Sequence, residues 1–205
     1  EWAIVNQTGI IEHAYTDGIN PYFQPRKAIS HTIRLQLPEI FFKIKTKNIF
    51  FYGAGCSNDE KKNTVKASIE TQFRIPAVVN SDLLGAARSL FLNEPGIACI
   101  LGTGSNTCFF DGEEIAKNVK SLGFILGDEG SGAAMGKMFL SDCLKGLAPE
   151  ELVIPFYHKY GIDPDQVLDY VYIKPFPNRL LSFFSLYLAE QTDHPYVHQL
   201  VYSCF

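Results

Sequence analysis

The chain has 205 residues, of which 46% are hydrophobic and 20% are charged, as in a soluble globular protein with enough apolar mass for a core. Its formal net charge of -4 and the lack of any basic cluster argue against a nucleic-acid partner, and no apolar stretch is long enough to cross a membrane. The five cysteines are widely spaced and form no C-x-x-C pair, which argues against a disulfide framework, a zinc site or a cluster site and fits a reducing cytoplasm.

Both ends of the chain are apolar. It opens on Glu1-Trp2-Ala3-Ile4-Val5 and ends on Leu200-Val201-Tyr202-Ser203-Cys204-Phe205. Natural termini are usually polar and loose. We therefore expect further segments at both ends.

Strand and helix patterns alternate through the first half of the chain. Residues 2–5 and 9–15 flank a short polar turn and predict a hairpin. Apolar residues four apart predict amphipathic helices over 25–37 and 59–73. Between these helices, 48–55 is a continuous apolar run that ends in glycines, which predicts a strand buried on both faces, as in a parallel sheet covered by helices.

The stretch Gly18-Ile19-Asn20-Pro21 has two interpretations. Asp-Gly and Asn-Pro pairs both bend the chain, so the segment is a turn. Alternatively, Asn20 contacts a ligand, because its amide can donate and accept hydrogen bonds to neighbouring hydroxyls at once.

A third strand is predicted over 76–82 and runs straight into a helical apolar stripe from Leu83 to Phe91, so Asp82 lies where the strand ends and the helix begins. Asp82 can be an N-cap, since aspartate accepts a hydrogen bond from the first-turn amides. It can also act on a ligand, because ligands of open α/β sheets bind at the carboxyl ends of the strands.

Asn93-Glu94-Pro95-Gly96 is the best linker signal, and it divides the chain into domains 1–94 and 95–205. The second half begins with strand patterns over 97–101 and 106–110. The turn Gly102-Thr103-Gly104-Ser105 joins them, and it is either a plain hairpin turn or a turn whose N–H groups and hydroxyls bind phosphate.

A second glycine cluster, Gly127-Asp128-Glu129-Gly130-Ser131-Gly132, precedes a predicted helix over 131–144. The first turns of that helix consist mostly of glycine and alanine, which carry little or no side chain. We therefore expect a ligand or another backbone to approach them closely. Asp128 and Glu129 suit the positive end of the helix, or they contact a ligand.

The tail over 149–205 has a helical pattern, and its aromatic residues are expected in the core. His194 and His198 are four apart, but Pro195 lies between them and no third ligand is near, so no metal site is predicted.

Four motifs occur in series: Gly18-Ile19-Asn20-Pro21, Val79-Asn80-Ser81-Asp82, Leu101-Gly102-Thr103-Gly104-Ser105-Asn106 and Gly123-Phe124-Ile125-Leu126-Gly127-Asp128-Glu129-Gly130-Ser131-Gly132. Together they resemble the N-acetylglucosamine kinase branch of the actin-like, hexokinase-like and Hsp70-like ATPase superfamily. The same sequence family includes the ATPases that activate benzoyl-CoA reductase. The resemblance covers about residues 2 to 140.

The resemblance implies an α/β protein with two ribonuclease H-like domains and a ligand cleft between them. It implies that ATP, with Mg²⁺, phosphorylates an amino sugar, N-acetylglucosamine, to its 6-phosphate. Asp82 would be the general base, and Gly102, Thr103, Gly104 and Ser105 would bind ATP phosphate. Asn20, Asp82 and Asp128 would hold the sugar. The partners would be sugar and ATP, with no nucleic acid or membrane, and a homodimer is allowed.

Three features depart from the family pattern. The sequence has no counterpart of the first phosphate motif, an Asp-Gly-rich hairpin, or of the nucleotide-side glycine motif expected late in the chain. In addition, Leu122 stands where the eukaryotic sugar kinases have tryptophan. Two alternatives are therefore kept: a reductase-activating ATPase and a non-catalytic sugar-binding sensor. The reductase activators need converging thiolates, whereas Cys56, Cys99 and Cys108 lie in or beside predicted strands and are expected to be buried structural thiols.

Overall fold

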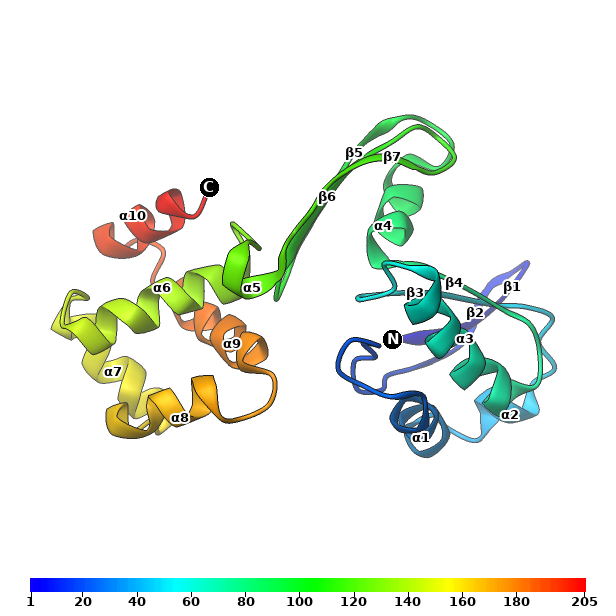
Figure 1. Ribbon diagram of the computed structural model, residues 1–205, viewed down its shortest axis with the longest axis horizontal. Helices are drawn as coiled ribbons and strands as arrows, with labels where there is room; N and C mark the ends of the chain where they lie inside the picture. The colour runs from blue at the N-terminus through cyan, green and yellow to red at the C-terminus, as the bar shows by residue number, and fades with distance from the viewer. The chain divides into compact units, whose positions relative to one another are not determined.

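The computed structural model describes all residues, 1–205, and the chain divides into two compact units (Figure 1). Unit 1 comprises residues 1–96 and 110–114, and unit 2 comprises 97–109 and 115–205. No helix is both long and apolar enough to cross a membrane.

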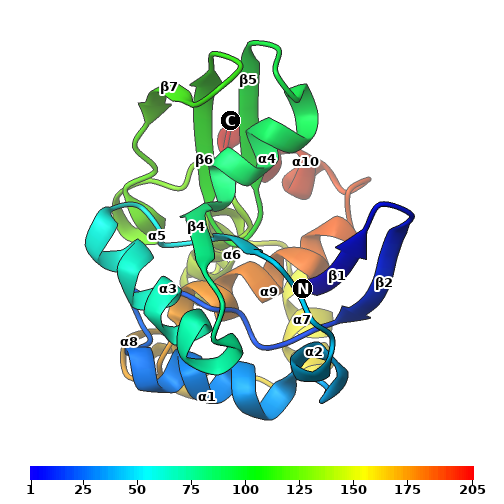
Figure 2. The ribbon, with the colours of Figure 1, turned by 90° about the vertical axis from the view of Figure 1, so that its right-hand side faces the viewer.

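Unit 1 opens with an antiparallel hairpin of β1 (Trp2–Asn6) and β2 (Gly9–Ala14), which confirms the predicted hairpin. Figure 2 shows the two strands side by side. The turn is closed by the Asn6 side chain, whose Oδ1 accepts a hydrogen bond from the Thr8 N–H at 2.8 Å.

The rest of unit 1 alternates helices and strands, with the following bounds: α1 (Arg26–Gln36), α2 (Ile40–Lys43), β3 (Ile49–Gly53), α3 (Asp59–Phe73), β4 (Ala77–Ser81) and α4 (Asp82–Phe91). β3 and β4 are parallel, with register from Ile49↔Ala77 to Gly53↔Ser81. Their carboxyl ends therefore lie at the same edge. The core joins Ile29 and Ile33 of α1 to Val65 and Ile69 of α3.

The prediction that β3 is buried on both faces is wrong. Ile49 and Phe51 pack into the core with α1 and α3, but Phe50 on the opposite face is 64% exposed. Tyr52, two residues further along the strand, contacts α4, and its hydroxyl accepts a hydrogen bond from Arg88 at 3.1 Å. A continuous apolar run does not distinguish a strand with one covered face from a strand with two.

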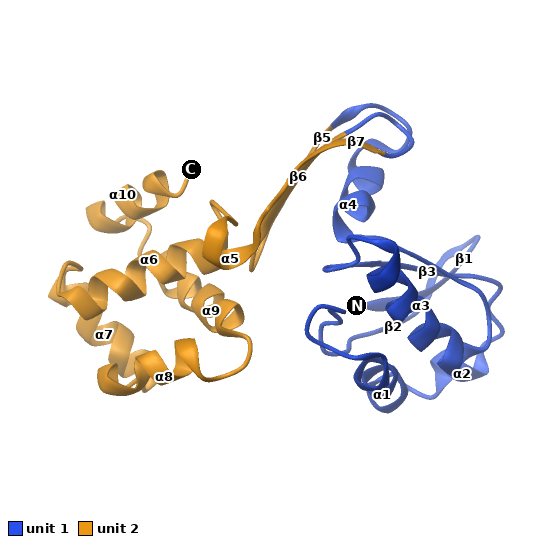
Figure 3. Ribbon diagram, in the orientation of Figure 1, with its two compact units in different colours: residues 1–96, 110–114 blue, residues 97–109, 115–205 orange.

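A three-stranded sheet in the order β5-β6-β7, most of which belongs to unit 2, is formed by β5 (Gly96–Leu101), β6 (Ser105–Phe110) and β7 (Ile115–Val119). Figure 3 shows that its distal turn, residues 110–114, groups with unit 1. Asp111 Oδ1 closes this turn by accepting hydrogen bonds from the N–H groups of Glu113 and Glu114, both at 2.9 Å. Cys99 on β5 is exposed, so the expectation of a buried thiol is wrong there, whereas Cys56 and Cys108 are buried.

The body of unit 2 is helical, as predicted for the tail. Its helices are α5 (Gly123–Leu126), α6 (Gly132–Lys145), α7 (Glu150–Tyr160), the 3₁₀ turn η1 (Pro164–Gln166), α8 (Val167–Tyr172), α9 (Pro177–Ala189) and α10 (Pro195–Ser203). Phe139, Phe156, Phe184 and Tyr187 form an aromatic core in which the rings of Phe139 and Phe156 meet edge to face at 5.0 Å. Phe183 lies outside this core and is 49% exposed.

Two glycines of α6, Gly132 and Gly136, lie where α9 packs closely against this helix. A Cβ added to Gly136 would lie 1.8 Å from the carbonyl oxygen of Leu181, and one added to Gly132 would lie 2.6 Å from Ser182 Oγ. Of the two explanations that the sequence left open, close approach of another backbone accounts for Gly136, whereas Gly132 makes room for serine side chains of α9.

Candidate functional site

Asp82 lies at the carboxyl edge of the β3–β4 pair, where Gly53 and Ser81 form the last matched residues. The N-cap of α4 is Ser81, whose hydroxyl accepts a hydrogen bond from the Leu84 N–H at 3.3 Å, so the N-cap interpretation of Asp82 is wrong. Asp82 is half-buried, and its Oδ1 accepts from the Leu83 N–H at 2.9 Å. Its Oδ2 has no hydrogen-bond partner, which leaves that atom free to accept a proton or a hydrogen bond.

Asn20 has the turn role that the sequence allowed, and its contact with a ligand stays a prediction. Its Oδ1 accepts a hydrogen bond from the Tyr22 N–H at 3.0 Å, and its carbonyl oxygen accepts from the N–H groups of Phe23 and Gln24, so it holds a turn. The side-chain Nδ2 donates no hydrogen bond within the chain and is free for a ligand. Oδ1 also lies 2.3 Å from the position of a Cβ at Gly55, where φ is +77°.

Cys56 lies near both Asn20 and Asp82. It follows Gly55, and burial, with the nearby charge of Asp82, raises the pKa of its thiol to about 11. Cys56 is therefore a neutral thiol at physiological pH, and thiols in that state are poor metal ligands and nucleophiles. Asn20, Cys56 and Asp82 thus gather at one edge of unit 1.

The glycine turn of unit 2 is built against the start of α6. The N–H groups of Gly132 and Ala133 donate to the carbonyl oxygens of Gly102 and Thr103 at 2.8 and 3.1 Å. The Gly102 N–H donates to the Gly104 carbonyl oxygen at 2.9 Å. The N–H groups of Thr103 and Gly104 have no partner in the chain, so they are the donors that this turn can offer an anion.

Asp128 packs onto the same turn. It is 8% exposed, and a Cβ added to Gly104 would lie 2.7 Å from its Oδ2. Burial raises the pKa of the Asp128 carboxyl, although a hydrogen bond from the Ser105 N–H opposes this effect. Its backbone has φ of +58°, a conformation that few residues other than glycine and asparagine adopt. The second glycine cluster therefore meets the first within one unit.

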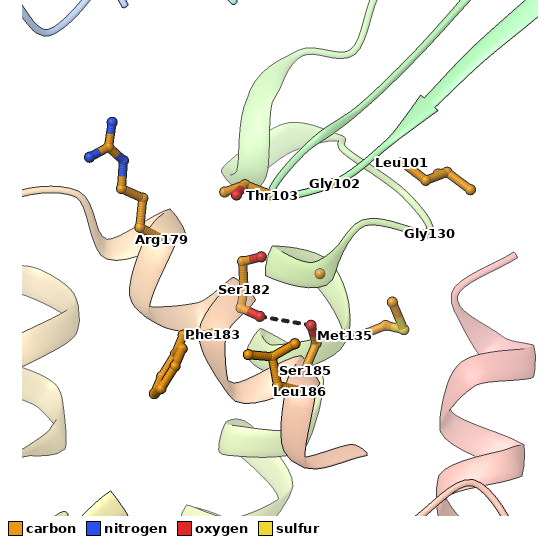
Figure 4. A pocket seen from close by; sticks show the side chains of 11 residues that line it. Leu101, Gly102, Thr103, Gly130, Met135, Arg179, Ser182, Phe183, Ser185 and Leu186 are labelled. Atoms are coloured by element: carbon orange, nitrogen blue, oxygen red, sulfur yellow. Dashed lines mark hydrogen bonds between the residues drawn. The ribbon is translucent and has the colours of Figure 1, made fainter. Parts of the chain in front are cut away.

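A cavity of about 490 Å³ opens beside the turn in unit 2 (Figure 4). It is lined on one side by Leu101, Gly102 and Thr103, and on the other by residues of α9 that include Arg179, Ser182 and Phe183. The sequence patterns do not identify the residues from α9. No local signal marks them, because packing of α9 against α6 creates the cavity.

The site residues fall into two groups. Asn20 and Asp82 belong to unit 1, whereas the turn at Gly102–Ser105 and Asp128 belong to unit 2. A crevice that brings Asp82 opposite the turn would involve both units, and it stays a prediction. The structure contains no group of three or more His, Cys, Asp or Glu side chains that could hold a metal.

Comparison with solved structures gives the class of protein to which this fold belongs. A putative N-acetylglucosamine kinase from Porphyromonas gingivalis superposes with a TM-score of 0.91 and 43% sequence identity, covering 98% of this chain and 72% of that protein. A second putative N-acetylglucosamine kinase, from Chromobacterium violaceum, has a TM-score of 0.72 and 16% identity, with 95% and 71% covered, and shares the fold. No protein-family model and no curated protein matches the sequence.

At 43% identity over nearly its whole length, the chain belongs to a family of sugar kinases, the N-acetylglucosamine kinase-like branch named above from the four motifs. The resemblance that the motifs predicted is thereby confirmed.

Proposed function

We propose that this protein transfers the terminal phosphoryl group of ATP to an amino sugar and converts N-acetylglucosamine to its 6-phosphate. The likeness to the Porphyromonas gingivalis protein carries this proposal. We also propose the two-domain actin- and hexokinase-like architecture, with domains 1–94 and 95–205 and a ligand cleft between them. The two compact units, whose main boundary falls at residue 96, support this division.

In this proposal Asp82 is the general base. Its free Oδ2 takes the proton of the sugar hydroxyl as the oxygen bonds to the terminal phosphorus and the bond from that phosphorus to ADP breaks. Asn20, Asp82 and Asp128 hold sugar hydroxyls. The unbonded Nδ2 of Asn20, at the same edge as Asp82, supports a shared role for these two residues.

Gly102, Thr103, Gly104 and Ser105 bind ATP phosphate in this proposal. The free N–H groups of Thr103 and Gly104 fit that task, because phosphoryl transfer depends on donors fixed in advance around developing charge. Mg²⁺ would enter with ATP, since this ion is usually bound by substrate phosphates with few protein ligands. No residue of this chain is assigned to it.

The experiment is a coupled assay of ADP release with ATP, Mg²⁺ and a panel of sugars. We expect turnover to depend on N-acetylglucosamine, with a 6-phosphate identified by ³¹P NMR. Asp82→Asn should lower kcat by about 10²- to 10⁴-fold, the usual contribution of a general base, while sugar still binds by calorimetry.

Asp59→Asn is the matched control. Asp59 is the first residue of α3 after the cap Asn58, as Asp82 is the first residue of α4 after the cap Ser81. It should leave turnover unchanged. Binding of the sugar without any ADP release from the wild type would contradict the kinase and favour a sensor.

A further inference from the structure

Three residues that line the cavity of unit 2 carry donor groups with no hydrogen-bond or ion-pair partner in the chain. The hydroxyls of Thr103 and Ser182 make no hydrogen bond within the chain, and the Arg179 guanidinium forms no ion pair. Figure 4 shows the Arg179 side chain extending from α9 at the edge of the cavity, with its guanidinium directed away from Thr103 and Ser182. The lining of the cavity therefore carries one cation and two hydroxyls.

The residues that line this cavity include no carboxylate. A neutral sugar needs acceptors as well as donors around its hydroxyls, whereas a phosphate group offers only acceptors when ionised. The chemistry of the lining therefore fits an anion. Guanidinium groups are suited to phosphate because their fork of N–H donors can engage two oxygens at once.

Arg179 is held in place without using its hydrogen-bonding capacity. Its guanidinium carbon lies 4.6 Å from the centre of the Phe176 ring. Phe176 adopts the left-handed conformation with φ of +60°, and Pro177 follows as the first residue of α9. Stacking on a ring leaves the N–H donors of an arginine available. Non-glycine residues in this conformation are strained and tend to occur where ligands bind.

We propose that Arg179 and Ser182 bind the polyphosphate chain of the nucleotide in the cavity that Gly102 and Thr103 line. This inference rests on the proposed function for the identity of the ligand. It adds two residues of α9 to the turn, so that one phosphate-binding site is built from segments about 75 positions apart in the chain. A volume of about 490 Å³ is within the range of small-molecule sites.

Binding of ATP, sodium tripolyphosphate and adenosine to the whole 205-residue chain tests the proposal. By calorimetry, Arg179→Gln should weaken ATP and tripolyphosphate about tenfold or more, as expected for a lost charged hydrogen bond. It should leave adenosine binding unchanged. Arg179→Lys should restore part of the loss, and Ser182→Ala should show a smaller one.

Lys145→Gln is the charge-matched control, because Lys145 is an exposed residue at the end of α6 outside the cavity lining. It should bind all three ligands as the wild type does. The proposal is overturned if Arg179→Gln binds ATP and tripolyphosphate normally, or if the wild type binds neither. A wild type that binds both through Arg179 but never releases ADP with sugar would overturn the proposed function and leave this site standing.

Discussion

Asp128 combines burial with a left-handed backbone, and both features matter at the level of the single residue. Desolvation opposes the charged form of its carboxyl, while the Ser105 N–H favours that form, and the net effect raises the pKa above the ordinary value of 3.8. Asparagine has nearly the same shape and tolerates the left-handed region better than most residues. The negative charge of the Asp128 carboxylate therefore lowers the stability of the fold.

Asp128→Asn should make the protein more stable at neutral pH. A carboxyl whose folded pKa is raised stabilises the fold only in its protonated form, so its contribution is present below pH 3.8 and is lost as pH rises through the raised pKa. The advantage of the variant in urea unfolding should thus grow from acidic to neutral pH.

Glu129→Gln controls for the loss of a charge at the neighbouring exposed position. The Glu129 charge itself contributes to raising the pKa of Asp128, so this variant should show a pH-dependent gain of the same sign but smaller than that of Asp128→Asn. An Asp128→Asn variant that loses stability equally at every pH would show instead that the Ser105 hydrogen bond dominates. In the proposed kinase the same variant should turn over less sugar, because stabilising substitutions at functional positions commonly reduce activity.

At the scale of elements, the sequence predicts features that neighbouring residues determine, and it misses features that depend on packing between distant segments. The helix over 59–73 was predicted with its observed bounds, because Asn58 caps it and Val65 and Ile69 mark its buried face. β7 was not predicted, since Ile115–Val119 has no alternation of apolar residues and lies at the edge of its sheet. The exposure of Phe50 and the role of Arg179 follow from which helix packs where, and single-sequence patterns do not carry that information.

Gly136→Ala tests the packing of α6 on α9. Helix propensity alone predicts a gain of about 1 kcal/mol for this change. The added methyl would instead meet the Leu181 carbonyl oxygen at 1.8 Å, so we expect a net loss of about 1–3 kcal/mol, typical of overpacking. Urea denaturation measures the difference.

Ser141→Ala, a half-buried position on α6, provides the comparison. It should follow propensity and be neutral or slightly stabilising. A stabilised Gly136→Ala variant would mean that α9 can move away from α6 without loss.

At the scale of the whole molecule, the proposed kinase needs its two domains to close on the sugar, since closure excludes water and limits wasteful hydrolysis of ATP. The residues assigned to the site are divided between the two units, with Asn20 and Asp82 in one and the glycine turn in the other. The sequence motifs assign site residues to both units, and a site shared by the two units stays a prediction.

Closure should be visible in solution by small-angle X-ray scattering. N-acetylglucosamine added together with a non-hydrolysable ATP analogue should reduce the radius of gyration of the chain. The analogue alone is the control and should reduce it less. An unchanged radius with both ligands bound, as verified by calorimetry, would argue against a cleft that closes.

The contact between α6 and the glycine turn has one further consequence. In a trans peptide the C=O and N–H groups point in opposite directions, and the chain contains no cis bond. The carbonyls of Gly102 and Thr103, which accept from Gly132 and Ala133, share their peptide planes with the free N–H groups of Thr103 and Gly104. Each accepted bond polarises its plane and makes the opposite N–H more acidic. The partial positive charge at the N-terminus of α6 therefore acts through two polarised peptide groups. An anion at the turn can be stabilised by this helix without contacting it.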